Sequence, residues 1–312
     1  MFRRLKVERI EAVNTTGSED RDEVYIWAFG GTTRDNLNRR YPGADDYIGL
    51  HQGQVSSNIT LWDGFVGNGE GGFFRIYILE QDFGSDDFIG RVDVSFNVNN
   101  NQLSVQWIGA GIAGSSNNST VNIVARNQAV SSEYRIRMSI TESPVFRIEN
   151  KNSGKCLDVV SEWLGKANVQ QYNCKPANAS NINNQRWFIQ RTPYNKSIGR
   201  VSRDLRAVGT LFHIFANHSG DALDIEGGMS GINLQQYPFH GGTNQRWFIL
   251  RSEEPGFVYI VDNTVSRAFD VANASNASNA NIIVTQFHGG DSQKWKIQPN
   301  PPLSNWWYIK RP

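Results

Sequence analysis

The stretch Asn184-Gln185-Arg186-Trp187-Phe188-Ile189 decides the fold of the second half of the chain, because it returns twice. It recurs as Asn244-Gln245-Arg246-Trp247-Phe248-Ile249 and, in a weaker form, as Ser292-Gln293-Lys294-Trp295-Lys296-Ile297. Each copy centres on a Gln-x-Trp motif. Recurrence at a spacing of tens of residues is typical of repeat architectures, in which one unit depends on its neighbours for a core.

A second motif, an aspartate flanked by apolar residues, precedes each copy. It reads Cys156-Leu157-Asp158-Val159, then Ala222-Leu223-Asp224-Ile225, then Ala268-Phe269-Asp270-Val271. The aspartate lies 27, 21 and 23 residues before the glutamine of its Gln-x-Trp motif. Short apolar alternations and Gly- and Asn-rich turns surround both motifs, which predicts short strands. We therefore expect three repeats, at 146–191, 212–251 and 258–298.

Three units of this size can close one core around a pseudo-threefold axis. The tryptophan of each Gln-x-Trp motif is the large apolar residue available to fill the shared centre. Trp187, Trp247 and Trp295 are therefore interpreted as core residues and not as ligand contacts.

The charge of the chain divides it in two. The 312 residues carry 31 basic and 30 acidic side chains, a net charge of +1, which argues against a general nucleic-acid binder. Residues 1–143 hold 13 basic and 18 acidic residues, whereas residues 144–312 hold 18 and 12. Because Pro144 also interrupts a strand-like run, we expect one domain at 1–143 and a second at 144–312.

The chain offers little material for catalysis. It has two Cys and five His, and it shows neither a GxSxG nor an HExxH motif. The sequence alone leaves open a pair of catalytic carboxylates of the glycoside hydrolase kind.

The N-terminal MFRRLKVERI lacks the apolar region of a secretory signal peptide, and no apolar run is long enough for a spanning helix. We expect a protein that is not an enzyme, whose export route, if any, this sequence does not show.

Three Gln-x-Trp motifs, each preceded by an LDV-like aspartate, resemble those of the ricin-B-type β-trefoil lectins. The resemblance covers about residues 144–300, half of the chain. It implies a β-trefoil that binds carbohydrate, usually galactose or N-acetylgalactosamine, through one site per repeat and without a cofactor. A carboxylate that accepts sugar hydroxyls, an aromatic ring over the apolar sugar face and flanking amides suit this chemistry.

The resemblance assigns site residues repeat by repeat. Those of the first repeat are Asp158, Gln170, Tyr172, Asn184 and Gln185, and those of the second are Asp224, Gln235, Tyr237, His240, Asn244 and Gln245. The third retains Asp270, His288 and Gln293. Its aromatic position is Thr285, its strand amide is Ile283, and its asparagine is Ser292. We therefore expect a weak, altered or inactive third site; the alternative for all three aspartates is that they cap turns.

The two cysteines occupy related positions in the first repeat. Cys156 and Cys174 correspond to the apolar pairs Ala222 with Phe239 and Ala268 with Phe287, which suggests that these positions are neighbours in every repeat. The family resemblance implies a disulfide between Cys156 and Cys174. The alternative is two reduced thiols packed as small apolar groups.

The first 143 residues also read as strands. Apolar runs at 24–29, 73–79, 89–94 and 120–125 are bounded by Gly, Asn or Asp, and a β-sandwich is the natural interpretation. The predicted fold class of the whole chain is therefore all-β, an N-terminal β-sandwich followed by a C-terminal β-trefoil.

The segment 79–90 of the first half is similar to a strand–loop–strand of the calcium- and lipid-binding β-sandwiches of the synaptotagmin and protein kinase C type. The resemblance covers about residues 24–95. It implies that Asp82, Asp86 and Asp87 supply oxygen ligands to calcium, with Glu80 where that family has Asp. The alternative is a solvated acidic turn.

These observations favour a non-catalytic lectin whose partners are galactose- or N-acetylgalactosamine-type glycans. Two alternatives remain: a lectin-targeted toxin or defence protein, and a glycoside hydrolase with a carbohydrate-binding module. We expect action outside the cell or on foreign glycans, membrane contact only through glycans or the first domain, and no nucleic-acid partner; a homodimer is left open. The tail at Trp306-Trp307-Tyr308 is expected to pack between domains or on a partner.

Overall fold

A computed structural model describes residues 1–15, 22–43, 46–81, 87–100, 102–109, 111–113, 119–127, 132–160, 165–200 and 206–299. The chain divides into two compact units, Met1–Ser143 and Pro144–Pro312. The regular structure of the described residues consists of strands and five 3-10 turns, so the predicted all-β class is confirmed. None of the described helical turns has the length and apolar character needed to span a membrane. The aromatic tail at 306–308 lies outside the described residues.

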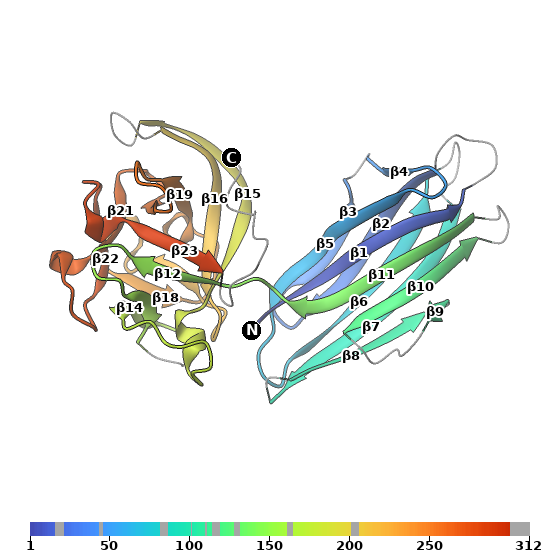
Figure 1. Ribbon diagram of the computed structural model, residues 1–312, viewed down its shortest axis with the longest axis horizontal. Coiled ribbons are helices and arrows are strands. Elements are labelled where there is room, and N and C mark those ends of the chain that lie inside the picture. The colour runs from blue at the N-terminus through green and yellow to red at the C-terminus, as the bar shows by residue number, and fades with distance from the viewer. Residues whose placement is uncertain are drawn as a thin grey trace. The chain divides into compact units, whose positions relative to one another are not determined.

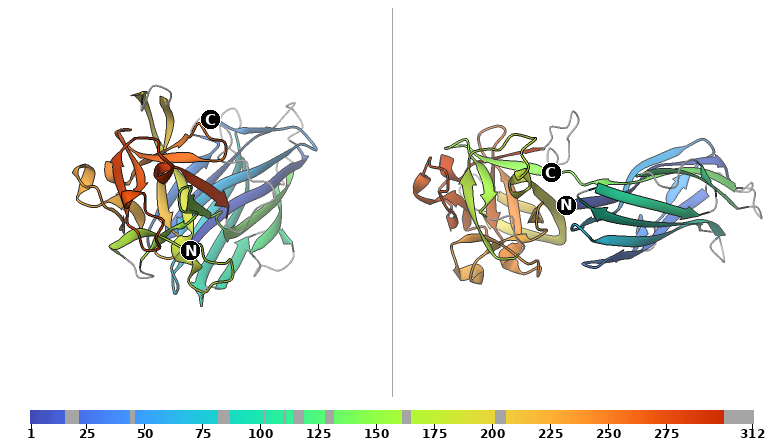
Figure 2. Two further views of the ribbon diagram at one scale, coloured as in Figure 1. Left: turned by 60° about the vertical axis from the view of Figure 1, so that its left-hand side comes forward. Right: turned by 90° about the horizontal axis from the view of Figure 1, so that it is seen from below.

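The N-terminal unit consists of two antiparallel sheets (Figures 1 and 2). The first sheet has the order β5-β1-β11-β10-β9, from strands Val55–Phe65, Phe2–Asn14, Ser132–Glu142, Thr120–Asn127 and Ile112–Ala113. The second has the order β3-β2-β6-β7-β8, from strands Asn36–Tyr41, Asp22–Thr32, Gly71–Glu80, Asp87–Asn99 and Gln102–Gly109, and β4 (Ile48–Leu50) pairs with β2.

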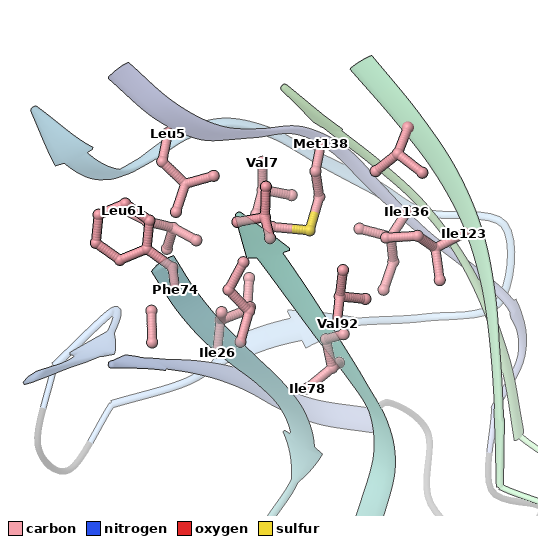
Figure 3. Packing of buried hydrophobic residues seen from close by; sticks show 14 of the residues in the cluster. Leu5, Val7, Ile26, Leu61, Phe74, Ile78, Val92, Ile123, Ile136 and Met138 are labelled. Atoms are coloured by element: carbon pink, nitrogen blue, oxygen red, sulfur yellow. The ribbon is translucent and has the colours of Figure 1, made fainter. Parts of the chain in front are cut away.

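One hydrophobic core lies between these two sheets. Buried residues alternate along β6 and most of β11, so that every second side chain there points inward. Figure 3 shows Leu5 and Val7 of β1 and Met138 of β11 facing Phe74 and Ile78 of β6. The sequence segments 24–29, 73–79, 89–94 and 120–125 lie in β2, β6, β7 and β10, as the strand patterns predict.

The C-terminal unit repeats one four-strand pattern three times. The first repeat contains β12 (Phe146–Asn150), β13 (Cys156–Val159), β14 (Ala167–Tyr172), η1 (Ile182–Gln185) and β15 (Trp187–Arg200). The second contains β16 (Arg206–Ala216), β17 (Ala222–Ile225), η2 (Gly228–Ser230), β18 (Leu234–Tyr237), η3 (Thr243–Gln245) and β19 (Trp247–Arg251). The third contains β20 (Val258–Asp262), β21 (Arg267–Val271), η4 (Ala272–Ala274), β22 (Ile282–Gln286), η5 (Asp291–Gln293) and β23 (Trp295–Pro299).

Strand pairing joins the repeats into a closed arrangement. The first and last strands pair across repeat boundaries, β15 with β16, β19 with β20 and β23 with β12. The two middle strands of each repeat form a hairpin, β13–β14, β17–β18 and β21–β22. In Figure 1 the green β12 runs beside the red β23, which brings the beginning and the end of the unit together.

The three tryptophans of the Gln-x-Trp motifs fill the centre of this unit. Trp187, Trp247 and Trp295 are fully buried in one hydrophobic cluster, as the sequence predicts. A buried indole N–H needs an acceptor. Each indole donates to the backbone carbonyl that precedes a motif aspartate: Leu157 at 3.2 Å, Leu223 at 3.2 Å and Phe269 at 3.1 Å.

A ring of three asparagine side chains closes one end of the unit. Asn168 donates its amide N–H to Asn281 Oδ1 at 2.8 Å, Asn281 donates to Asn233 Oδ1 at 2.9 Å, and Asn233 donates to Asn168 Oδ1 at 3.1 Å. Each asparagine lies two residues before the position opposite its motif aspartate. The ring, here called the asparagine ring, therefore joins equivalent points of the three hairpins.

The partly buried His218 predicts acid sensitivity of the C-terminal unit. Burial lowers the pKa of His218 from 6.5 to about 4. The unfolded chain therefore takes up a proton at a higher pH than the folded chain does, and stability falls as the pH decreases through this window, by up to about 3 kcal/mol. We expect His218→Gln to flatten the pH dependence of the free energy of unfolding, measured by urea titration at about pH 7 and about pH 4.5. Equal pH dependence in variant and parent would contradict this assignment.

Candidate carbohydrate-binding sites

Each motif aspartate lies directly opposite a residue of the neighbouring hairpin strand. The opposed pairs are Asp158 with Gln170, Asp224 with Gln235, and Asp270 with Ile283. In the first two repeats the cross-strand glutamine donates its amide N–H to Oδ1 of the aspartate, at 2.9 Å in both. Ile283 cannot donate, and Oδ1 of Asp270 is buried with no hydrogen-bond partner among the described residues. Hairpin register thus orients the first two carboxylates.

In the first repeat the second carboxylate oxygen is held by an amide and an ammonium. Asp158 Oδ2 accepts from Gln185 Nε2 at 2.9 Å and lies 3.6 Å from Lys175 Nζ. The same ammonium donates to Asn184 Oδ1 at 2.6 Å and to the carbonyl of Asn181 at 3.1 Å. Lys175 therefore provides a counter-charge for the buried carboxylate of Asp158 and fixes the amide of Asn184 beside it.

The second repeat uses a histidine at this place. Asp224 Oδ2 accepts from Asn244 Nδ2 at 2.7 Å and lies 3.3 Å from His240 Nε2. Asn244 also donates to the carbonyl of Ile225 at 3.3 Å. The structure thus brings together Asp224, Gln235, His240 and Asn244 of the set expected from sequence.

The third repeat gathers its contacts on one oxygen. Asp270 Oδ2 accepts from Thr285 Oγ1 at 2.9 Å and from Gln293 Nε2 at 3.2 Å, and it lies 2.9 Å from His288 Nε2. Ser292 is buried where the other repeats have asparagine. The third carboxylate is therefore held by one amide, a hydroxyl and an imidazole, whereas the second is held by two amides and an imidazole.

The glutamine of each Gln-x-Trp motif positions the turn beside its aspartate. Gln245 Oε1 accepts from the backbone N–H groups of His240 at 2.9 Å and Gly241 at 3.1 Å. Gln293 repeats this with His288 at 2.9 Å and Gly289 at 3.1 Å. Gly241 and Gly289 have φ values of +66° and +72°, a left-handed conformation that favours glycine. Gln185 accepts from the N–H of Lys175 at 2.8 Å.

Two sites carry an exposed aromatic ring. Tyr172 ends β14 and Tyr237 ends β18, and their side chains are 36% and 40% exposed. The ring of Tyr237 stands 6.1 Å from that of His240, edge to face. Because Thr285 occupies the equivalent strand position, the third site lacks this ring. An exposed ring beside a buried carboxylate thus distinguishes the first two sites.

The two cysteines form a disulfide, Cys156–Cys174, as the family resemblance implies. It ties β13 to the turn that carries Lys175.

Among the described residues, the one group of three close metal-ligand side chains consists of both cysteines and Glu149. Since its sulfur atoms are bonded to each other, this group is not a metal site.

The acidic loop of the N-terminal unit is described only in part. Asp82 and Asp86 lie outside the described residues, and Asp87 begins β7 opposite the buried Glu80. Calcium binding by these residues stays a prediction.

Sequence reasoning missed two residues that touch a motif aspartate, Lys175 and Thr285. The segment Phe239-His240-Gly241-Gly242 recurs as Phe287-His288-Gly289-Gly290, in both cases ending three residues before the motif glutamine. Since Cys174 corresponds to Phe239 and Phe287, the next residue, Lys175, corresponds to the two histidines. The match is hard to see in the sequence, because Lys175 lies 10 residues before its motif glutamine, Gln185, whereas each histidine lies 5 residues before its own.

The geometry described above defines a three-lobed β domain with one carboxylate-centred surface site per lobe. Comparison with protein families matches residues 131–204 and 201–285 to the ricin-type beta-trefoil lectin domain-like family. The C-terminal unit of the chain belongs to this family.

Solved structures give similar matches, each to about half of this chain. The designed three-fold symmetric protein ThreeFoil is 32% identical, with a TM-score of 0.38 over 49% of this chain and 96% of its own. The C-half of the earthworm R-type lectin, in complex with GalNAc, is 18% identical, with a TM-score of 0.37 over 50% and 99%. The ricin B-like lectin of Macrolepiota procera, in complex with lactose, is 17% identical, with a TM-score of 0.38 over 49% and 93%. A comparison with curated proteins finds no match.

The disulfide predicts a measurable contribution to stability. Replacing both cysteines, Cys156→Ala with Cys174→Ala, releases a cross-link between residues 18 positions apart, and we expect the free energy of unfolding to fall by about 3 kcal/mol. Urea unfolding of the variant and the parent measures the difference. An unchanged midpoint would show that packing alone holds the turn at Lys175.

Proposed function

We propose that this protein is a non-catalytic lectin that binds galactose- or N-acetylgalactosamine-type glycans at the sites of Asp158 and Asp224, with a weaker third site at Asp270. The proposal includes the arrangement of an N-terminal β-sandwich and a C-terminal β-trefoil. The observation that carries it is the repeated placement of a buried, amide-held carboxylate beside an exposed tyrosine. The choice of sugar follows from the family to which the C-terminal unit belongs.

The chemistry of these sites suits the binding of a pyranose. A carboxylate oxygen that already accepts one amide N–H retains lone pairs for sugar hydroxyls, and a charged acceptor strengthens such hydrogen bonds. Tyr172 and Tyr237 offer an apolar ring face to the C–H face of the sugar. The groups that hold Asp158 and Asp224 are amides, an ammonium and an imidazole, an arrangement for binding and not the carboxylate pair of glycoside hydrolysis.

Two equivalent sites on one rigid unit favour clustered glycans. After the first site is occupied, a second sugar on the same surface is held at high effective concentration. Weak single sites can thereby give strong attachment to a glycan-rich surface.

The exposed tyrosines allow a test that spares the fold. We expect Tyr172→Ala with Tyr237→Ala to weaken binding of galactose, N-acetylgalactosamine and lactose about tenfold or more, because each site loses its stacking surface. Isothermal titration measures the affinities, and a glycan array measures the range of sugars bound. Ile232→Ala is the matched control, because this side chain is 60% exposed on the same unit and contacts none of the three aspartates.

A second variant, Asp158→Ala with Asp224→Ala, removes both carboxylates and should abolish binding at these two sites, leaving only the weaker binding of the Asp270 site. Circular dichroism must show that it remains folded, because these aspartates are buried. Unchanged binding by either double variant would refute the site assignment, and release of sugar from any arrayed glycan would refute the absence of catalysis.

A further inference from the structure

A cavity of about 510 Å³ lies beside the Asp224 site, on the other side of His240. Its walls come from β15, β16 and the turn between β18 and β19. The lining residues are Gln190, Arg191, Thr192, His213, Phe239, His240, Gly241 and Arg246. His240 belongs to both places, because its Nε2 approaches Asp224 while the residue also lines the cavity.

His213 and Thr192 are the buried polar residues among those that line this cavity. His213 is only 6% exposed and lies opposite Gln190 in the β15–β16 pairing. Its Nδ1 donates to the carbonyl of Gln245 at 2.9 Å, which leaves Nε2 as the acceptor of the ring. Burial, followed by the nearby charge of Arg246, lowers the pKa of His213, so the imidazole is neutral at neutral pH. The cavity thus contains a neutral acceptor.

Two guanidinium groups make the cavity positive. Arg191 is exposed and donates one N–H to Thr210 Oγ1 at 2.8 Å, so that further donors remain for a ligand. Arg246 donates to the carbonyl of Gly241 at 2.6 Å, which fixes it against the turn. Asp and Glu are absent from the described residues that line the cavity, and Asp224 Oδ2 lies 3.3 Å from Nε2 of the lining residue His240.

The third repeat has a larger, hydrogen-bonded side chain at the position of His213. Tyr259 replaces His213, and its ring stands 4.8 Å from Phe287, just as His213 stands 4.8 Å from Phe239. The Tyr259 hydroxyl donates to Glu253 at 2.8 Å and to the carbonyl of Gly289 at 3.2 Å.

The cation of the third repeat is neutralised as well. Lys294, at the position of Arg246, lies 2.7 Å from Glu253, and this pairing lowers the pKa of Glu253 to about 2. In the first repeat Arg147 stands at the position of His213 and donates to Gln298 Oε1 at 3.3 Å. In the second repeat, by contrast, the described lining of the cavity holds two guanidinium groups and no acidic side chain.

We propose that this cavity binds an acidic group, a carboxylate or a sulfate, of a glycan whose neutral sugar occupies the Asp224 site. The guanidinium groups of Arg191 and Arg246 pair with the oxyanion. His213 Nε2 accepts from a hydroxyl of the acidic part of the glycan, which lactose lacks. Gln190 adds a donor and an acceptor, and the half-exposed ring of Phe239 covers an apolar edge. The inference rests on the proposed function, since it places the acidic group beside a sugar that Asp224 holds.

The test compares neutral and acidic ligands on the full chain. Isothermal titration with lactose, sulfated lactose, sialylated lactose and inorganic sulfate should show acidic lactoses binding about tenfold tighter than lactose, and inorganic sulfate weakest. Arg191→Gln and, separately, His213→Tyr should lower the acidic lactoses to the affinity of lactose and leave lactose itself unchanged. The His213→Tyr variant inserts the residue that the third repeat accommodates. Arg251→Gln, at the end of β19 and therefore at the position of the second repeat that corresponds to Arg191 in the first, is the matched control.

Three results would overturn the proposal: equal affinity for neutral and acidic lactoses in the parent, an acidic preference that survives both variants, or inorganic sulfate binding as tightly as the acidic lactoses. The last would define a simple anion site. If lactose does not bind but the acidic lactoses bind in a manner sensitive to Arg191→Gln, the cavity proposal holds and the neutral-sugar site fails.

Discussion

The hydrogen bond from each central indole to the carbonyl before a motif aspartate links the core of the C-terminal unit to its surface. In a Gln-x-Trp segment the tryptophan fills the core, while the glutamine two residues earlier holds the turn beside the aspartate. The indole then fixes the backbone from which that aspartate projects. A short tripeptide therefore determines both the packing of a repeat and the position of its carboxylate. This coupling explains how a site on short strands and turns can be held in one geometry.

The same frame carries different charges in the three repeats. The residue next to the aspartate is Lys175 in the first repeat and a histidine in the other two. At the position of His213, which lines the cavity of the second repeat, the third repeat has the larger Tyr259. Because the backbone is already supported by the core and the motif glutamines, these side chains can change without loss of the fold. The three repeats therefore differ in the charge beside the aspartate while the surrounding hydrogen bonds of the turn are retained.

The repeats were predictable from sequence because their signals are local and recur. Asp158, Gln170 and Gln185 meet as the motif spacing and the family resemblance predict, since hairpin register places them together. Lys175 was not found, because a longer loop hides its equivalence to His240. The cavity at His213 depends on the pairing of β15 with β16 and on the smaller size of histidine compared with tyrosine. A search for sequence motifs detects neither of these features. In the N-terminal unit the strands were predictable from alternation, whereas nothing local indicates what the unit binds.

The asparagine ring makes the three repeats interdependent. Each amide donates to one neighbour and accepts from the other, so the ring has a direction of circulation, and all three amides must share it for the ring to close. An aspartate at any of these positions has an acceptor where the ring needs a donor. Amino-acid changes at one hairpin are therefore constrained by the other two, even where the sugar sites themselves have diverged. Amino-acid changes in the loops of one repeat therefore need no matching change in the other repeats, whereas changes at the asparagine ring do.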